Sequence, residues 1–380
     1  MVRCHVVALL LASACSFDPK AALVADASRD GTQPVDAAAP TDATADARCV
    51  VGSLDLCAQG TPDPASTLSG TIHTGTDARC RTLPQPGGPD ACLILADGVT
   101  IGDLIGIGPR PLVVVSTTDL TITGALDVSS RLGVRDGAAA NDASCAVSGQ
   151  PESDLGGAAG AAGGSFHGAG GNGGEGDTDN SLGNDGTALA GLASAAITQP
   201  AFLRGGCPGG RGGDEGGGGL GGAGGSSGGA VWLVAAGKLE LLATGSIRAT
   251  GAGGAPGQVQ SGGGGGGSGG LIVLEATTLA IGGPVSANGG GGGEGGTRFG
   301  STSVTGNKGA DGDLGATPAP GGFGALGSSG DGGAGSAGAQ LDGGAGESTI
   351  VGAGGGGGAA GFIHLIGTVQ GSGVVSPPAS

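Results

Sequence analysis

The stretch GGGGGGSGGLIVLEATTLAI (residues 262–281) contains both features that decide the fold. A run of glycine leads into a short apolar stretch of Leu, Ile and Val, and the same succession recurs along the chain. Glycine accounts for 95 of the 380 residues. Because glycine has no side chain to act as acid, base, ligand or nucleophile, these residues serve backbone conformation and not chemistry.

The apolar stretches are copies of one another. Val113–Leu120, Trp232–Leu239 and Ile272–Leu279 align without gaps, a shorter copy begins at Phe362, and Cys92–Val99 is a degenerate copy. Each full copy is followed by an alternating apolar tail with a glycine at its bend. Period-two alternation rich in β-branched residues predicts strands. Similar units that recur along a chain predict a solenoid in which each unit, or rung, stacks on the next.

The residue types inside the copies favour one kind of solenoid. Aromatic residues make up only 2% of the chain and Tyr is absent, so aliphatic side chains must fill the interior. We therefore expect an all-β fold, with a right-handed parallel β-helix or related β-solenoid as its architecture.

The glycine-rich segments between the copies vary in length, which indicates excursions from the rungs. Glycine recurs near every third position, as at Gly157, Gly160 and Gly163, and three residues per turn is the period of the polyproline II helix. Disorder is the alternative, because glycine loses more conformational entropy on ordering than any other residue. The sequence leaves both interpretations open.

Composition divides the chain into five parts. We expect a signal segment with a lipobox-like Cys at 1–15, a disordered tether rich in Asp, Ala, Pro and Thr at 16–48, and a Cys-containing β cap with the first rung at 49–132. A Gly-rich excursion follows at 133–227, and solenoid rungs with Gly-rich loops occupy 228–380.

The N-terminus has the order of an export signal. Arg3 precedes the apolar run Val6–Leu11 and then Ala12-Ser13-Ala14-Cys15, and that run is too short to span a membrane. Small residues before a Cys predict lipidation of Cys15, although Leu11 stands four residues before it where a lipobox usually has Leu three before. Ala12–Ala14 also fits the cleavage rule of ordinary secretion. We expect an exported protein, lipid-anchored to the outer membrane and exposed at the cell surface.

The tether contains six aspartates within 16–48 and buries too little apolar surface to fold. As a coil of about 30 residues it would span roughly 30 Å, enough to hold a folded domain off a membrane.

Six cysteines remain in the exported part and predict disulfides. Pairing of sequence neighbours is the simplest of the 15 connectivities that six cysteines allow. A zinc site is the weaker alternative, because no CxxC pair occurs. The expected pairs are Cys49–Cys57, Cys80–Cys92 and Cys145–Cys207.

The formal net charge of −17 argues against binding of nucleic acid, which needs a basic face. It predicts a self-repelling, well-solvated exterior. We expect no nucleic-acid partner. Extracellular polysaccharide and other cells are the candidate partners, and the oligomeric state stays open.

No cofactor is expected, and calcium is the candidate that comes nearest. Residues 209–214 match the first six positions of the calcium-binding nonapeptide GGxGxDxUx, but the apolar eighth position is Gly216 and no tandem copy follows. Asp177, Asp179 and Asp214 carry oxygen ligands suited to a hard cation. Solvated loop carboxylates are the alternative interpretation of all three.

The same residue types allow a carbohydrate-active enzyme, which needs carboxylates, or carboxylates with Arg or Lys, on one face. Acids on the copies alternate into outward positions and would line one face if the rungs stack, although solvation explains them equally well. They are Asp119, Asp127, Glu240 and Glu275. His73, His167 and His364 are far apart, and His364 is expected to point outward from its strand. Trp232, the single Trp, is expected in the core and is alternatively a sugar-stacking ring.

The order of parts resembles a group of uncharacterised, Gly-rich bacterial surface lipoproteins. The resemblance rests on the Cys-led signal, the tether, and motifs that extend over most of the chain. These are Thr76-Asp77-Ala78-Arg79-Cys80, Pro109-Arg110-Pro111-Leu112-Val113-Val114-Val115, Arg204-Gly205-Gly206-Cys207-Pro208-Gly209-Gly210 and Gly266-Gly267-Ser268-Gly269-Gly270-Leu271-Ile272. The Gly-rich blocks are also similar in composition to the PE-PGRS proteins of mycobacteria, whose N-terminal domain is missing here. Neither resemblance implies an activity or catalytic residues.

The sequence therefore favours a non-catalytic, lipid-anchored surface protein with a structural or adhesive role. A carbohydrate-active enzyme or carbohydrate-binding protein on a β-helix is the first alternative, and a calcium- or ice-binding module is the second.

Overall fold

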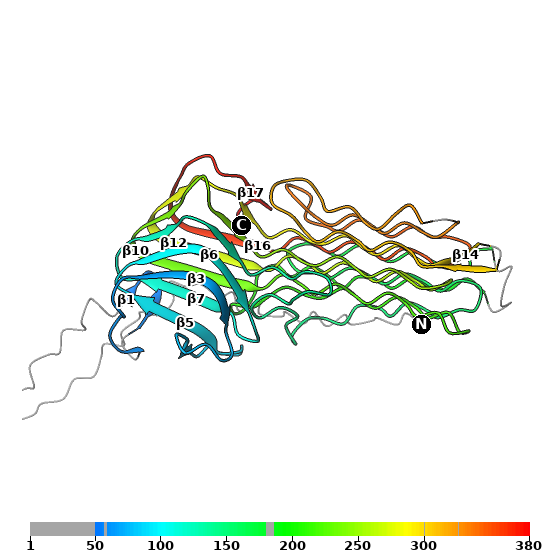
Figure 1. Ribbon diagram of the computed structural model, residues 1–380, viewed down its shortest axis with the longest axis horizontal. Coiled ribbons are helices and arrows are strands. Elements are labelled where there is room, and N and C mark those ends of the chain that lie inside the picture. Colours follow the sequence, from blue (N-terminus) through cyan, green and yellow to red (C-terminus); the bar gives the residue numbers. More distant parts are fainter. Residues whose placement is uncertain (1–49, 57–58, 180–185, 300, 326) are drawn as a thin grey trace, which may run out of the picture. The chain divides into compact units, whose positions relative to one another are not determined.

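The computed structural model describes residues 50–380 except 57–58, 180–185, 300 and 326 (Figure 1). The chain divides into two units, residues 1–47 and 48–380, and the strands described below belong to the second. The described residues form strands and extended segments but no helix, so the all-β class is confirmed. In this part of the chain there is accordingly no apolar helix of membrane-spanning length. The signal segment with Cys15, the tether and Cys49 lie outside the described residues.

Most of the strands belong to three parallel ladders. The first ladder contains the predicted copies as neighbouring strands, and their alignment places one aliphatic column inside it: Ile94, Val114, Leu233, Leu274 and Leu365. Its strands are β5 (Ala91–Ala96), β7 (Leu112–Ser116), the first half of β10 (Ala230–Leu241), the first half of β12 (Leu271–Ile281) and β16 (Phe362–Gln370).

The second and third ladders contain the predicted tails. In the second, β3 (Ser66–His73), β6 (Val99–Ile107) and β8 (Leu120–Ile122) join the second halves of β10 and β12. In the third ladder, the C-terminal ends of β3 and β6 pair with each other, and four short strands extend this ladder from β6 onward. These are β9 (Ala125–Asp127), β11 (Ser246–Arg248), β13 (Val285–Ser286) and β17 (Val375–Ser376).

The inward side chains of all three ladders meet in one core. Val114, Ile122 and Leu126 represent the three ladders in it, and each has no exposed surface. Pairing of Leu126 with Ile247, and of Ile247 with Val285, confirms the predicted equivalence of the tails. Aliphatic columns therefore fill the interior, as the composition requires.

One detail of the predicted alignment is wrong. Leu239 pairs with Leu279 as expected, but Trp232 pairs with Val273 and not with Ile272. The register shifts between Ala235 and Lys238, because β10 has one residue more than β12 in this stretch. An extra residue in one strand is a bulge, which a gap-free alignment cannot represent.

Antiparallel pairs at the periphery make the sheet system mixed. β1 (Val50–Val51) pairs with β2 (Leu54–Asp55), and β4 (Arg81–Leu83) adds an antiparallel strand to β5. β14 (Thr297–Phe299) and β15 (Thr302–Val304) form a separate hairpin.

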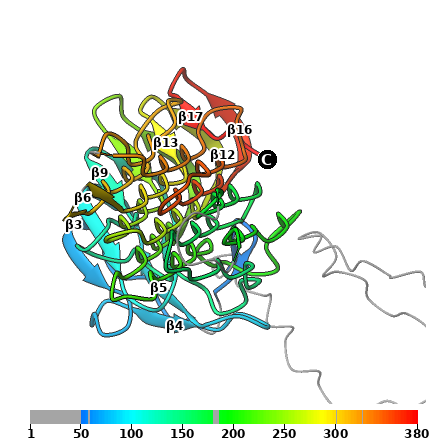
Figure 2. The same cartoon turned by 90° about the vertical axis from the view of Figure 1, so that its right-hand side faces the viewer.

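The chain returns from the third ladder to the first by two different routes. Between β6 and β7 it crosses directly through residues 108–111. After β9, β11 and β13 it instead runs through the Gly-rich segments, which lie side by side as a bundle next to the ladders (Figure 1). Figure 2 shows the same bundle end-on. Residues 133–227 therefore pass along the bundle several times before β10.

Backbone hydrogen bonds connect the segments of the bundle at intervals of three residues. Gly160 N and Gly163 N donate to Gly174 O and Gly171 O of an antiparallel neighbour, each at 2.9 Å. Ala158 N and Ala161 N donate to the O atoms of Gln260 and Gly263 in a parallel neighbour, at 2.9 and 3.0 Å. Three residues is the repeat of the polyproline II helix. Of the two interpretations of these segments, the ordered one agrees with the structure.

Glycine is required where the segments contact. A Cβ on Gly160, Gly163 or Gly265 would lie closer than 3.0 Å to a backbone carbonyl of a neighbouring segment, a separation that real Cβ atoms essentially never show. The absence of side chains therefore allows the backbones to approach within hydrogen-bonding distance, which offsets part of the entropy lost by ordering glycine.

Candidate functional site

The two described disulfides are those predicted. Cys80 pairs with Cys92 and Cys145 with Cys207. Cys49 and Cys57 lie outside the described residues, so their pairing stays a prediction.

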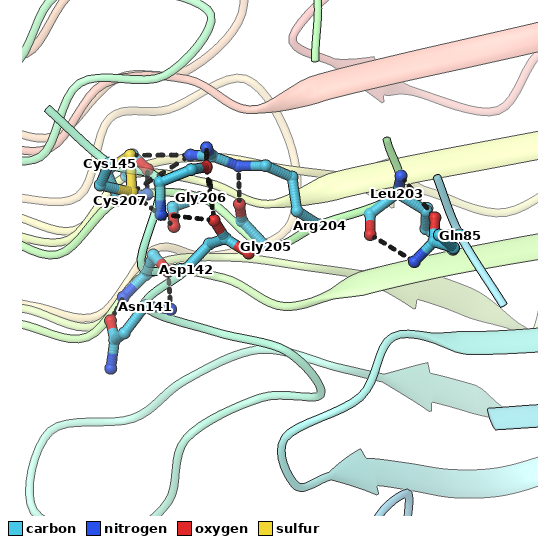
Figure 3. A network of polar contacts seen from close by, with 12 residues as sticks. Gln85, Asn141, Asp142, Cys145, Leu203, Arg204, Gly205, Gly206 and Cys207 are labelled. Carbon is cyan, nitrogen blue, oxygen red and sulfur yellow. Dashed lines mark hydrogen bonds and ion pairs between the residues drawn. A yellow bond between two sulfur atoms is a disulfide. The ribbon is translucent and has the colours of Figure 1, made fainter. Parts of the chain in front are cut away.

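Arg204 occupies the junction between the bundle and the β strands (Figure 3). Its Nη2 lies 3.1 and 3.0 Å from the sulfur atoms of Cys145 and Cys207. Its Nη1 donates to Ser144 Oγ and lies 3.5 Å from Asp142 Oδ1. The guanidinium also lies 5.0 Å from the centre of the Phe166 ring. Burial lowers the pKa of Arg204 and the Asp142 charge opposes this shift.

The neighbouring Leu203 connects this junction to the β4–β5 loop. Leu203 N donates to Gln85 Oε1 at 2.9 Å, and Gln85 Nε2 donates to Leu203 O at 3.1 Å (Figure 3). Leu203 and Phe166 cover the outer side of the first ladder, where they meet Leu93, Val113 and Phe362. The Arg204–Pro208 motif thus serves packing.

Two other motifs behind the lipoprotein resemblance also make structural contacts. Arg110 N donates to Thr74 Oγ1 at 3.1 Å and Arg110 Nε donates to Thr74 O at 2.7 Å, which fixes the direct turn before β7. Arg79 donates to both carboxylate oxygens of Asp77, from Nε at 2.9 Å and Nη2 at 2.7 Å, next to the Cys80–Cys92 bridge. The hydrogen bonds from the Arg79 side chain lower the pKa of Asp77 from 3.8 to about 2, against a smaller opposing effect of burial.

We expect Arg79→Gln to raise the Asp77 pKa from about 2 toward 3.8, measured by NMR titration of the carboxyl carbon. Because the folded-state pKa is depressed, the pair stabilises the fold above pH 3.8, and the contribution is lost as the pH falls from 3.8 toward about 2. The variant should lack this acid-side loss. An Asp77 pKa unchanged in Arg79→Gln would contradict the assignment.

The expectation that four acids line one face is wrong. Asp127 lies in the third ladder, Glu240 in the second and Glu275 in the first. Asp119 precedes β8, where its Oδ1 accepts from Lys238 N at 2.7 Å. The chain changes direction between the ladders. Outward side chains on different ladders therefore point to different sides of the molecule.

These carboxylates have structural partners. Glu275 is buried and accepts a 2.8 Å hydrogen bond from Ser53 Oγ, and Glu240 pairs with Lys238 Nζ at 2.8 Å. Asp127 Oδ2 lies 2.5 Å from Arg135 Nη2, and its Oδ1 accepts from Ser129 N at 2.9 Å.

The calcium candidates are not brought together around a cation site. Asp214 accepts both Nη groups of Arg211, at 2.5 and 3.0 Å, as well as Gly221 N at 2.8 Å, and the Arg211 hydrogen bonds lower its pKa. Asp177 is buried and Asp179 is exposed in the adjacent turn. In the part of the chain that the structure describes, no group of three His, Cys, Asp or Glu is placed to hold a metal ion. Calcium binding stays a prediction.

The structure brings together two of the three histidines that lie in its described part, which the sequence does not predict. The rings of His167 and His364 both stack on Phe362, with centroid distances of 4.2 and 5.8 Å. Burial lowers the pKa of His167. His364 occupies an outward position of β16, as expected, and its Nδ1 lies 2.9 Å from Ser380 O. Trp232 is half-buried among the outward side chains of the first ladder and packs against a cluster that includes Val113.

An open groove of about 370 Å³ lies on the outer side of the third ladder. It combines two carboxylates with an arginine on one face, which is the kind of set that a carbohydrate-active site requires. Sequence reasoning identified Asp127 but missed Asp103 and Arg248, because no repeat or motif marks them. The lining residues are Gly70, Thr71, Asp103, Leu104, Ile105, Ala125, Asp127 and Arg248.

A second open groove, of about 290 Å³, lies within the bundle. Residues 307–310 and 320–323 line it, with Lys308 as the charged side chain. It offers no carboxylate to pair with a cation or a hydroxyl, so the groove on the third ladder is the stronger candidate site.

Comparison with models of protein families, with curated proteins and with solved structures finds no match for this chain.

Proposed function

We propose that the chain is a non-catalytic, lipid-anchored cell-surface protein with a structural or adhesive role. The observation that carries the proposal is the bundle, in which glycine backbones bond directly to one another. The carboxylates of Glu215 and Glu294, buried within it, accept backbone N–H groups of the bundle. Such a bundle suits a rigid body that presents its exterior. Its exterior is apolar at several positions, including Val147, Leu189, Leu192 and Phe323, each more than half exposed.

We further infer that the three ladders are the sides of a right-handed parallel β-helix whose rungs extend into polyproline II hairpins. The spacing of paired residues supports this architecture. Leu112 follows its partner Cys92 by 20 positions, and Leu126 follows its partner Leu104 by 22. Nearly equal spacing in two ladders is expected when one rung comprises about that number of residues.

The disulfides support the export part of the proposal. Cys80–Cys92 and Cys145–Cys207 are of the kind that persist in secreted and surface proteins and are rare in the cytosol. The charge of −17 fits a soluble exterior that does not associate with anionic surfaces. Lipidation of Cys15 and exposure at the outer membrane are part of the same proposal.

A carbohydrate-binding role is the second candidate, and the groove on the third ladder favours it. Catalysis by the predicted acids has less support, because Asp127 and Glu275 are held by Arg135 and Ser53. A glycosidase needs two carboxylates that flank one bond, whereas these two lie in different ladders.

The proposal is tested by protease treatment of intact cells that express the wild type or Cys15→Ala. We expect the wild type to be digested at the surface, and the variant to be released to the medium or periplasm. Adhesion to other cells or to extracellular matrix should then fall when the wild type is removed. Protection of the wild type in intact cells would contradict the surface location, and with it the adhesive role.

A further inference from the structure

The groove on the third ladder is built on one row of outward side chains. Thr71, Ile105, Asp127 and Arg248 are direct partners across four neighbouring strands, β3, β6, β9 and β11. Because neighbouring strands lie about 4.8 Å apart, the row extends over roughly 14 Å. This length accommodates more than one ring of an extended ligand.

Arg248 has a hydrogen-bond donor that no described residue accepts from. Its Nε is buried and has no hydrogen-bond partner among the described residues. A buried donor without a partner costs free energy, and native proteins contain few of them. Arg248 also lines the groove, and a guanidinium carries five N–H donors, so this side chain can donate to a ligand oxygen placed there.

Asp103 and Thr71 provide the complementary groups at the other side of the groove. Asp103 is exposed, and its Oδ1 accepts Ala125 N at 2.9 Å. A carboxylate has about four acceptor positions, so capacity remains for a ligand. The exposed Thr71 hydroxyl both donates and accepts. Donors and acceptors together match hydroxyl groups, which also do both.

The charges of the groove balance. The carboxylates of Asp103 and Asp127 are matched by the guanidinium groups of Arg248 and Arg135, the latter 2.5 Å from Asp127. The chain as a whole carries −17 and repels polyanions. Ile105 and Ala125 supply apolar surface between the polar groups. These properties favour an uncharged, hydroxyl-rich ligand over an acidic one.

We propose that this groove binds a neutral glycan, with Arg248 and Asp103 hydrogen-bonded to sugar hydroxyls. The inference rests on the proposed adhesive function, for which it supplies the ligand class and the site. Arg135 is a positioning residue, because it holds the Asp127 side chain beside Arg248.

The test is calorimetric titration of the full-length protein, purified in detergent, with malto-, cello-, manno- and xylo-oligosaccharides and with oligogalacturonate. We expect at least one neutral oligosaccharide to bind. Arg248→Gln and Asp103→Asn should each weaken that binding about 10- to 100-fold, the effect of losing one or two hydrogen bonds to a charged group. Asp103→Asn retains the oxygen that accepts Ala125 N, so its fold should be unaffected.

Arg298→Gln is the matched control, since Arg298 lies in β14, outside the three ladders. It removes the same charge and should leave binding unchanged. Circular dichroism of every variant establishes that the strands persist. Should Arg248→Gln fail to fold, Asp103→Asn still decides the outcome.

Three results would overturn the inference. They are no binding of any neutral oligosaccharide at millimolar concentration, binding restricted to oligogalacturonate, and neutral binding that both groove variants retain. Cell adhesion measured with Asp103→Asn separates the two proposals. Adhesion that persists while glycan binding is lost would leave the surface-protein proposal standing and overturn the groove as its adhesive site.

Discussion

Replacing Gly265 by alanine is expected to destabilise the protein by more than about 3 kcal/mol, at or above the usual upper range for overpacking. A Cβ at this position would overlap the carbonyl group of Ala162. Gly265 N donates to Gly210 O at 3.0 Å, and Gly265 O accepts from Gly225 N at 2.8 Å. The residue thus touches three neighbouring segments, so none of them can move away without breaking hydrogen bonds to another. Urea unfolding followed by circular dichroism measures the loss.

Gly216→Ala is the control for Gly265→Ala. Its Cβ would meet only the side chain of Leu155, which is 52% exposed and free to shift. We expect a change in unfolding free energy below about 1 kcal/mol, within the range of a surface substitution or slightly above it. Equal effects of the two substitutions would contradict close backbone packing as the reason for glycine in the bundle.

Removing the Cys145–Cys207 bridge, as the double variant Cys145→Ser and Cys207→Ser, should cost about 4 kcal/mol by the loop-entropy argument. The bridge joins residues 62 positions apart, and the enclosed segment is rich in glycine, whose unfolded chain is unusually free. The loss also removes the sulfur contacts of Arg204 at the junction. Urea unfolding of the oxidised wild type and of the variant gives the difference.

The Cys80–Cys92 bridge serves as an internal comparison. Its 12-residue separation predicts a smaller effect, about 3 kcal/mol. Limited proteolysis should show cleavage within 145–207 in the first variant and none there in the second. A larger loss on removing Cys80–Cys92 would mean that local packing, and not loop closure, determines the value of these bridges.

Much of the strand arrangement was predictable because it depends on local pattern. Alternating side chains identify the inward face of each strand, so the copies beginning near Val113, Trp232 and Phe362 were found as neighbours in one ladder. The pairing of cysteines that are neighbours in the sequence was predicted as the simplest connectivity, and it is correct for Cys80–Cys92 and Cys145–Cys207. The period of three in glycine predicted polyproline II segments as one of two open interpretations, and the backbone hydrogen bonds between segments decided in favour of order.

The candidate site was predictable only in part. Asp127 was identified from its outward position, but Asp103 and Arg248 join it only because β6, β9 and β11 are adjacent. Arg248 follows Asp127 by more than a hundred residues, most of them in the bundle. No local sequence pattern predicts that the chain returns after such an excursion to form β11 beside β9.

The β class, the repeated strands and the aliphatic interior could be predicted from the sequence alone, together with the pairing of the two described disulfides as the simplest connectivity. The strands and their interior depend on side-chain alternation, which is readable residue by residue. Three features became visible only in the folded chain. They are the bulge in β10, the separation of Asp127, Glu240 and Glu275 among three ladders, and the groove around Arg248. Those features depend on which distant segments become neighbours, as when Ser53 meets Glu275 across 222 positions, and that choice is made by packing of the whole chain.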